Sequence, residues 1–116
     1  MAILNDLTWQ QLADQLPENA IKVNSSGQIV IDLSTVNSMP VNTLTDTGVI
    51  KFFSVLFSAA NKAQIVANES QPDGEKLTAF NPATIGTTND GFVTLTRPFT
   101  CRSELATATN IIGTNG

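Results

Sequence analysis

Histidine and tyrosine are absent from the 116 residues, and cysteine occurs once, at Cys101. Without histidine the chain cannot perform Ser-His-Asp or Cys-His catalysis. The usual structural zinc sites also need histidine or several cysteines, so we expect no metal site and no cofactor. One cysteine cannot form an intramolecular disulfide, which is compatible with a reducing compartment. Cys101 itself is expected to be a small buried hydrophobic residue.

Charged residues are also scarce, at 14% of the chain against roughly 25% in typical soluble domains. Ten acidic and six basic residues give a net charge of -4. The basic residues are scattered singly along the chain: Lys22, Lys51, Lys62, Lys76, Arg97 and Arg102. Nucleic-acid binding needs a concentrated basic face, so we predict none. A polar surface with so few charges repels its own copies poorly and favours self-association.

The length predicts one domain spanning residues 1–116, which is large enough to bury a core without disulfides. The first residues show no basic segment, long apolar run or cleavage site, so we expect no secretory signal and a cytoplasmic location. Asparagine and threonine are abundant, a composition compatible with a bacterial or phage protein.

A short amphipathic helix is predicted over residues 7–16. Thr8 and Gln11 have the spacing of a capping box at its start. Pro17 ends the helix, because proline restricts the residue before it and lacks a backbone donor. Trp9 lies on the apolar side of this helix and is expected to be a core anchor.

Strands are predicted over 20–24 and 28–33, joined as a hairpin in which Gly27 takes a positive φ. Residues 34–45 are predicted to be a polar connector, with Asp32 at an exposed face or turn. The turn Pro72-Asp73-Gly74 then leads to a predicted strand over 76–80.

The last predicted strand covers 92–96 after the turn Asn89-Asp90-Gly91, with a possible short strand at 84–87 and a continuation beyond Pro98. The loop from Gly86 to Gly91 lacks the lysine of a phosphate-binding P-loop, so a hairpin is the preferred interpretation. Together the elements predict an α+β fold. Its antiparallel sheet of about four to five strands carries a short N-terminal helix and one long central helix on one face.

The long helix is predicted from residue 47 to 66 or 68, capped by Asp46 or Thr45. Its apolar residues cover more than the single stripe of a surface helix, so more than one face must be covered. The uncharged apolar stretch between Lys51 and Lys62 is only ten residues long, half of what a bilayer requires, and we therefore predict no membrane span.

Two arrangements of this helix remain. Either the chain's own sheet and first helix enclose it, or one side packs on the sheet and the other on a partner subunit. We favour the second, because large exposed apolar patches usually mark interfaces. The expected contact in a homo-oligomer, with a dimer as the first hypothesis, comprises Phe52, Phe53, Leu56, Phe57 and Ala60.

The functional hypothesis is a small, non-enzymatic structural or adaptor domain that self-associates through the helix at 47–66. No catalytic residues are assigned, because the carboxylates, lysines and Cys101 form no recognisable catalytic pattern. The alternative is a small-molecule-binding protein or an unrecognised enzyme with a pocket between the long helix and the sheet. Arg97 and Arg102 could flank a small anionic ligand on the sheet, although a surface role is the preferred interpretation.

Overall fold

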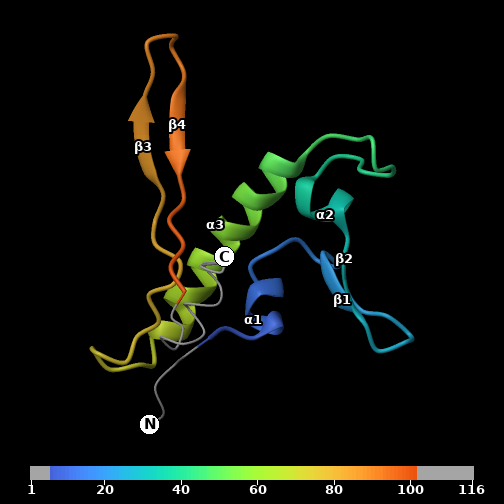
Figure 1. The fold of residues 1–116 in the computed structure, drawn as a ribbon. Coiled ribbons are helices and arrows are strands. Elements are labelled where there is room, and N and C mark those ends of the chain that lie inside the picture. The colour runs from blue at the N-terminus through green and yellow to red at the C-terminus, as the bar shows by residue number, and fades with distance from the viewer. Residues whose placement is uncertain (1–5, 102–116) are drawn as a thin grey trace, which may run out of the picture.

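The computed structural model describes residues 6–101 of the chain. In chain order its elements are α1 (Trp9–Ala13), β1 (Ile21–Val23), β2 (Ile29–Ile31), α2 (Leu33–Asn37), α3 (Val49–Asn68), β3 (Thr84–Thr87) and β4 (Val93–Thr96). The mixed helix and strand content agrees with the predicted fold class. Helix α3 is the central element: α1, α2 and the β1–β2 hairpin lie on one side of it, and the β3–β4 hairpin lies on the other (Figure 1).

The expected single sheet of about four to five strands is not confirmed. The strands of the described residues form two separate antiparallel sheets, β1–β2 and β3–β4, each with two strands. The segment predicted as a strand over 76–80 contributes one isolated bridge, between Phe80 and Phe99. Much of its backbone hydrogen bonding goes instead to side chains of α3, so the segment does not need a full strand partner.

The predicted capping box at the start of α1 is confirmed. The backbone N–H of Gln11 donates to the Thr8 hydroxyl at 3.1 Å, and the N–H of Thr8 donates to the Gln11 side chain at 2.7 Å. The helix is shorter than predicted, and the interpretation of Trp9 as a core anchor is wrong, because its side chain is 60% exposed. So short a helix buries little: it contacts the core through Leu12, followed by Leu16 in the next turn.

The β1–β2 hairpin forms where the sequence predicts it, but its strands are shorter: by one residue at each end of β1, one at the start of β2 and two at the end of β2. Val23 pairs with Ile29, and Gly27 has the positive φ of 78° that the turn requires. The Asn24 carboxamide oxygen accepts the backbone N–H groups of Ser26 and Gln28, both at 2.9 Å. The turn is therefore held by a side chain as well as by the backbone.

Helix α2 occupies part of the segment predicted to be a polar connector. Asp32 is its N-cap and accepts the backbone N–H of Thr35 at 3.1 Å, so this residue has a structural role beyond an exposed turn. Ser38, with a φ of 55°, ends the helix. Buried Asn37 donates from Nδ2 to the carbonyl oxygen of Gly48 at 2.9 Å, which ties α2 to the start of α3.

Helix α3 has the predicted extent to within two residues, but its predicted cap is wrong. The N-cap is Gly48, which offers no side-chain cap. The Asp46 carboxylate instead accepts the backbone N–H groups of Asn42 and Thr43 at 2.7 and 3.0 Å. The Asp46 carboxylate thus stabilises the turn that precedes the helix and does not cap the helix itself.

The buried core is small and rich in alanine. Its fully buried hydrophobic residues within the described part of the chain are Leu16, Ala20, Val36, Ala59, Ala60 and Ala63. Phe52, Val55 and Leu56 of α3 are partly buried against it. Because the buried side chains are mostly small, many large apolar residues of the chain stay exposed.

Candidate functional site

Side-chain amides of α3 hold the segment that leads to the β3–β4 hairpin. Gln64 donates to the carbonyl oxygen of Phe80 and accepts its N–H, and Asn68 does the same with Leu77, each bond being 2.8 Å long. Asn61 adds a further donor to the Phe80 carbonyl oxygen at 2.8 Å. Asn61, Gln64 and Asn68, the three amide side chains in the C-terminal half of α3, therefore all bind backbone groups of the 77–80 segment.

An aromatic cluster reinforces this attachment. The Phe80 and Phe99 rings are 5.1 Å apart, and the Phe57 ring lies 6.4 and 6.0 Å from them. These separations are typical of stacked aromatic pairs. The base of the hairpin is thereby fixed on α3, while its strands extend away from the body (Figure 1).

The five residues predicted to form an interface lie in different environments. Phe52 and Leu56 are half-buried against the core, and Phe57 is half-buried within the aromatic cluster. Ala60 is buried, whereas Phe53 is 49% exposed. Of these five, Phe53 is therefore the residue most accessible to a partner, and Ala60 supports packing within the chain.

Four further apolar residues of α3, which the predicted interface did not include, are also exposed. Val49 and Ile50 lie at its N-terminal end, where Ile50 is 88% exposed, and Ile65 and Val66 lie near its C-terminal end. A shallow hollow of about 400 Å³ adjoins Val49 and Ile50. We call the side chains of Val49, Ile50 and Phe53 the apolar helix surface.

Helix α3 is also long and apolar enough to cross a bilayer when only length and composition are considered. It has 20 residues, and its most apolar window has a mean hydropathy of 1.3 with 22% of its residues buried. The core helix of a soluble protein can meet the same criteria of length and composition. The absence of a membrane span stays a prediction based on Lys51 and Lys62.

The β3–β4 hairpin carries a second exposed apolar surface. Residues directly opposite in an antiparallel ladder share a face, and Ile85 pairs with Leu95 while Thr87 pairs with Val93. One face is therefore formed by Ile85, Val93 and Leu95, and all residues of both strands are exposed. An isolated two-stranded hairpin is marginally stable in water. An additional contact on this face would stabilise it.

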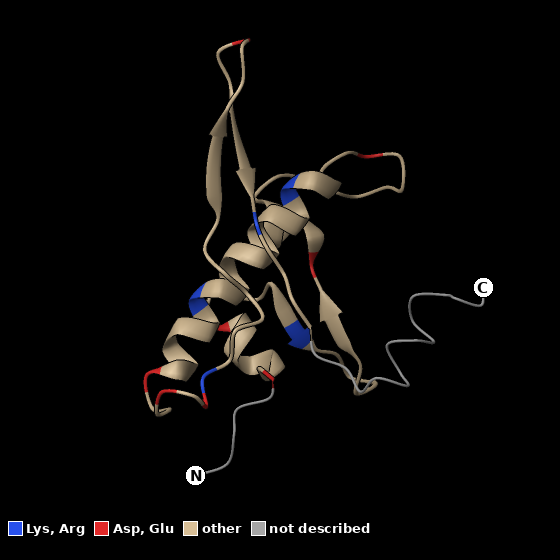
Figure 2. Cartoon of the chain, turned by 60° about the vertical axis from the view of Figure 1, so that its left-hand side comes forward, with Lys and Arg blue, Asp and Glu red and all other residues tan. Residues whose placement is uncertain are grey.

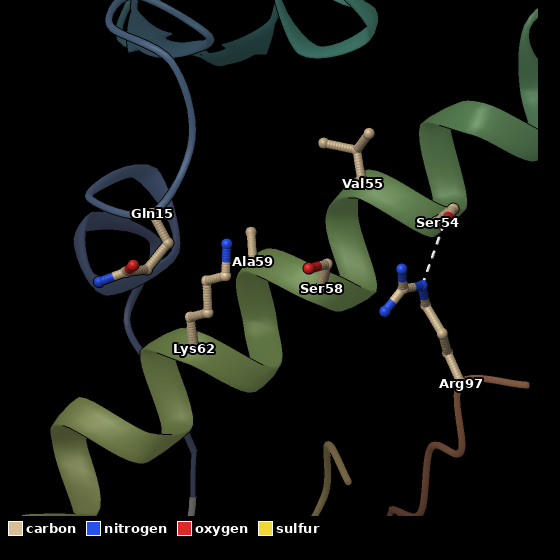
Figure 3. A pocket seen from close by; sticks show the side chains of 7 residues that line it. All are labelled: Gln15, Ser54, Val55, Ser58, Ala59, Lys62 and Arg97. Atoms are coloured by element: carbon tan, nitrogen blue, oxygen red, sulfur yellow. Dashed lines mark hydrogen bonds between the residues drawn. The ribbon is translucent and has the colours of Figure 1, made fainter. Parts of the chain in front are cut away.

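A polar cavity of about 210 Å³ lies between α3, the turn after α1 and the segment after β4 (Figure 3). Its lining residues are Gln15, Ser54, Val55, Ser58, Ala59, Lys62 and Arg97. Ser54, Ser58 and Lys62 are spaced four residues apart and therefore lie along one face of the helix. Arg97 approaches from the opposite side, and its Nε donates to the Ser54 hydroxyl at 3.0 Å.

The charge of this cavity is uniformly positive. Lys62 and Arg97 line it, and neither aspartate nor glutamate does. Within residues 6–101, the one ion pair joins Lys76 and Asp73 at 3.5 Å, so neither cavity cation is paired there. Figure 2 shows that α3 carries basic residues and no acidic ones along its length.

The sequence expectation paired Arg97 with Arg102, which lies outside the described residues. In the structure Arg97 lies beside a row of polar residues on α3, formed by Ser54, Ser58 and Lys62. This row was not predicted as a site. The regular four-residue spacing of Ser54, Ser58 and Lys62 was visible in the sequence. Its meeting with Arg97, 43 residues after Ser54, depends on the tertiary structure.

Two exposed carboxylates have a lowered pKa. The Thr88 hydroxyl and then the backbone N–H of Phe92 hold the pKa of Asp90 below its ordinary value. The backbone N–H groups of Asn42 and Thr43 do the same for Asp46. Hydrogen bonds to the charged form explain both shifts, and both groups stabilise turns.

Cys101 is exposed, so its predicted burial is wrong; it follows the Phe80–Phe99 bridge, beyond the part of the segment that packs on α3. Among residues 6–101, no group of three or more acidic or cysteine side chains is placed to hold a metal ion. The described residues thus offer two candidate features for function: exposed apolar surfaces and one basic cavity.

No protein-family model, curated protein or solved structure matches this chain.

Proposed function

We propose that the protein is a small, non-enzymatic structural or adaptor component that self-associates through α3. The observation that carries this proposal is the apolar helix surface, in which Val49, Ile50 and Phe53 are all exposed on one end of a continuous helix. The exposure of these three side chains supports an interface at the N-terminal half of α3.

Burial of these side chains against a partner is more favourable in free energy than their exposure to water. Burying one fully exposed large apolar side chain contributes about 1.5–3 kcal/mol. Val49, Ile50 and Phe53 are 68%, 88% and 49% exposed, so about half or more of each side chain is free to be buried by a partner. The chain's own core, with mostly alanine buried, does not use this surface.

A symmetric dimer is the simplest assembly, because a two-fold axis lets one patch meet its own copy. Lys51 is exposed among the apolar residues, and its long side chain can extend to the rim while its charge stays in water. The exposed face of β3–β4 offers a second contact that would extend the same assembly beyond a dimer. A cytoplasmic location and a non-enzymatic role are parts of this proposal.

Sedimentation equilibrium of the purified full chain over micromolar concentrations tests the proposal. Ile50→Asp is the most informative variant, because a side chain this exposed contributes little to the core and an acidic residue is tolerated near a helix N-terminus. We expect Ile50→Asp and Phe53→Asp to weaken association at least tenfold. The unfolding midpoint of Ile50→Asp should equal that of the wild type when both are measured at a dilution at which the wild type is monomeric.

The matched control is Ser26→Asp, which adds the same charge in the exposed β1–β2 turn and should leave association intact. A wild-type chain that stays monomeric at high micromolar concentration would overturn the proposal. Association that is equally strong in Ile50→Asp and Phe53→Asp would overturn the assignment to α3.

The alternative function, small-molecule binding, is favoured by one specific observation. The cavity has polar and basic walls and lies beside α3, the helix on which the sequence-based alternative placed a pocket. Its two basic residues and its lack of acidic ones favour an anionic ligand, whether or not the protein self-associates.

A further inference from the structure

We propose that the cavity bounded by Ser54, Ser58, Lys62 and Arg97 is a binding site for a phosphate group. The proposal rests on two serine hydroxyls and two cations that line one hollow, neither cation being ion-paired within residues 6–101. It stands whether or not the protein self-associates. The ligand is either free phosphate or the phosphate of a small ester, because both present the same oxyanion.

The donors come from two sides of the cavity. Along α3, the hydroxyls of Ser54 and Ser58 and the ammonium of Lys62 follow one another at successive turns of the helix. From the segment after β4, the Arg97 guanidinium reaches the Ser54 end of this row, beside Ser54 and Ser58, while Lys62 lies at the other end (Figure 3). A tetrahedral oxyanion accepts hydrogen bonds in several directions, so donors on opposite sides match it better than they match a planar carboxylate.

Arg97 retains donors for a ligand while it is held in place. Its Nε is engaged by the Ser54 hydroxyl at 3.0 Å, which fixes the plane of the guanidinium. Arginine has five N–H donors, and within the described residues the terminal nitrogens of Arg97 make no other hydrogen bond. A guanidinium oriented in this way loses less side-chain entropy when it binds an anion.

The size and charge of the cavity define the ligand class. At about 210 Å³ it is smaller than typical sites for drug-sized molecules, which range from about 300 to 1,000 Å³. Its walls lack an acidic residue, so a cation would find no ligand there and an anion meets no repelling carboxylate. Val55 and Ala59 complete the lining of the hollow.

Titration of the isotope-labelled full chain with inorganic phosphate, followed by amide chemical shifts in NMR spectra at constant ionic strength, tests the site. We expect saturable shifts at Ser54, Ser58 and Lys62, with a dissociation constant in the millimolar range or lower. Glycerol phosphate and acetate are the comparison probes. Tighter binding of glycerol phosphate identifies a phosphate ester as the ligand, tighter binding of inorganic phosphate identifies the free ion, and acetate should bind more weakly than both.

Lys62→Gln and Arg97→Gln should each weaken phosphate binding about tenfold or more, as expected for the loss of a charge-assisted hydrogen bond. Lys51→Gln is the matched control, because it removes the same charge from the same helix outside this cavity. Lys62 is exposed, so Lys62→Gln keeps the test valid if Arg97→Gln disturbs the hairpin.

The proposal fails if no saturable shift appears at tens of millimolar phosphate. It also fails if Lys51→Gln weakens binding as much as Lys62→Gln, since that result would indicate diffuse attraction to the helix. Acetate binding as tight as phosphate would overturn the assignment to a tetrahedral oxyanion.

Discussion

Gln64 and Phe80 form a reciprocal hydrogen-bonded pair between the long helix and the base of the second hairpin. The Gln64 side chain donates to the Phe80 carbonyl oxygen and accepts the Phe80 N–H, and both bonds are 2.8 Å long. Gln64 is only 7% exposed. One glutamine thus takes the place of a neighbouring strand for this residue, which explains how the hairpin remains attached without a larger sheet.

Gln64→Leu should destabilise the protein by about 1–3 kcal/mol, because a part-buried backbone donor loses its partner. In this variant the Phe80 carbonyl oxygen still accepts a hydrogen bond from Asn61. The Phe80 N–H group is therefore the one left without its hydrogen-bond acceptor. Urea unfolding measures the change in stability, and hydrogen exchange at the Phe80 amide should become faster.

The control for this substitution is Gln10→Leu, on the exposed face of α1, where a change within about 0.5 kcal/mol is expected. Equal destabilisation by the two variants would show that the reciprocal pair adds nothing beyond general surface effects.

Phe53 and Phe57 lie one turn apart on α3 and should respond differently to the same substitution. Phe57→Ala removes a ring that stacks against Phe99 at 6.0 Å and should lower stability by about 2–4 kcal/mol. Phe53→Ala should lower stability less and association more, because its side chain is half exposed. Thermal unfolding of dilute protein measures the change in stability, and sedimentation measures the change in association. A greater loss of stability in Phe53→Ala than in Phe57→Ala would contradict the assignment of Phe53 to the surface and Phe57 to the packed cluster.

Gly48→Ala should destabilise the start of α3 by about 1–3 kcal/mol. Gly48 has a φ of 124°, and a Cβ there would lie 2.7 Å from Nδ2 of Asn37, the atom that bonds the Gly48 carbonyl. Gly27→Ala is the control, since its φ of 78° imposes backbone strain but its Cβ would meet nothing within 4 Å. Denaturant midpoints should therefore fall further for Gly48→Ala, and the reverse order would refute the steric argument.

The stability of the β3–β4 turn should decrease in acid. The folded-state pKa of Asp90 lies below its ordinary value, with the Thr88 hydroxyl as the main cause. A lowered pKa means that the carboxylate's contribution is complete above the unfolded pKa and is lost as the pH falls through the folded one, which places the loss below about pH 4.

The measurement is the amide exchange and chemical shift of Phe92 between neutral pH and pH 3, compared with Asp90→Asn. The variant should show a weakened turn at neutral pH and little further change on acidification. An identical acid response in both proteins would assign the effect to other carboxylates.

The chain should not insert into a bilayer, despite the length of α3. Asn61, Gln64 and Asn68 bind backbone groups of the segment at 77–80, and exposing this helix to lipid would require breaking those bonds. In a flotation assay with neutral phosphatidylcholine vesicles, the protein should stay with the aqueous fraction. Recovery with the vesicles after a carbonate wash would contradict the prediction.

The sequence by itself determined the elements whose causes are local. The capping box of Thr8 and Gln11, the turn at Gly27 and the extent of α3 all follow from contacts within a few residues, and the structure confirms them. Helix α2 also had a local cause, the Asp32 cap, but the polar composition of the segment obscured it.

Only the tertiary structure decided how these elements meet. Strand periodicity predicts that a segment is extended and not which partner it finds, so it did not reveal that Gln64 would bind Phe80 across 16 residues of chain. The apolar content of α3 was evident, but which of its sides is exposed depends on where α1, α2 and the Phe80–Phe99 bridge pack. The cavity beside Lys62 has the same origin, because the hairpin returns Arg97 to a helix that ended long before it in the sequence.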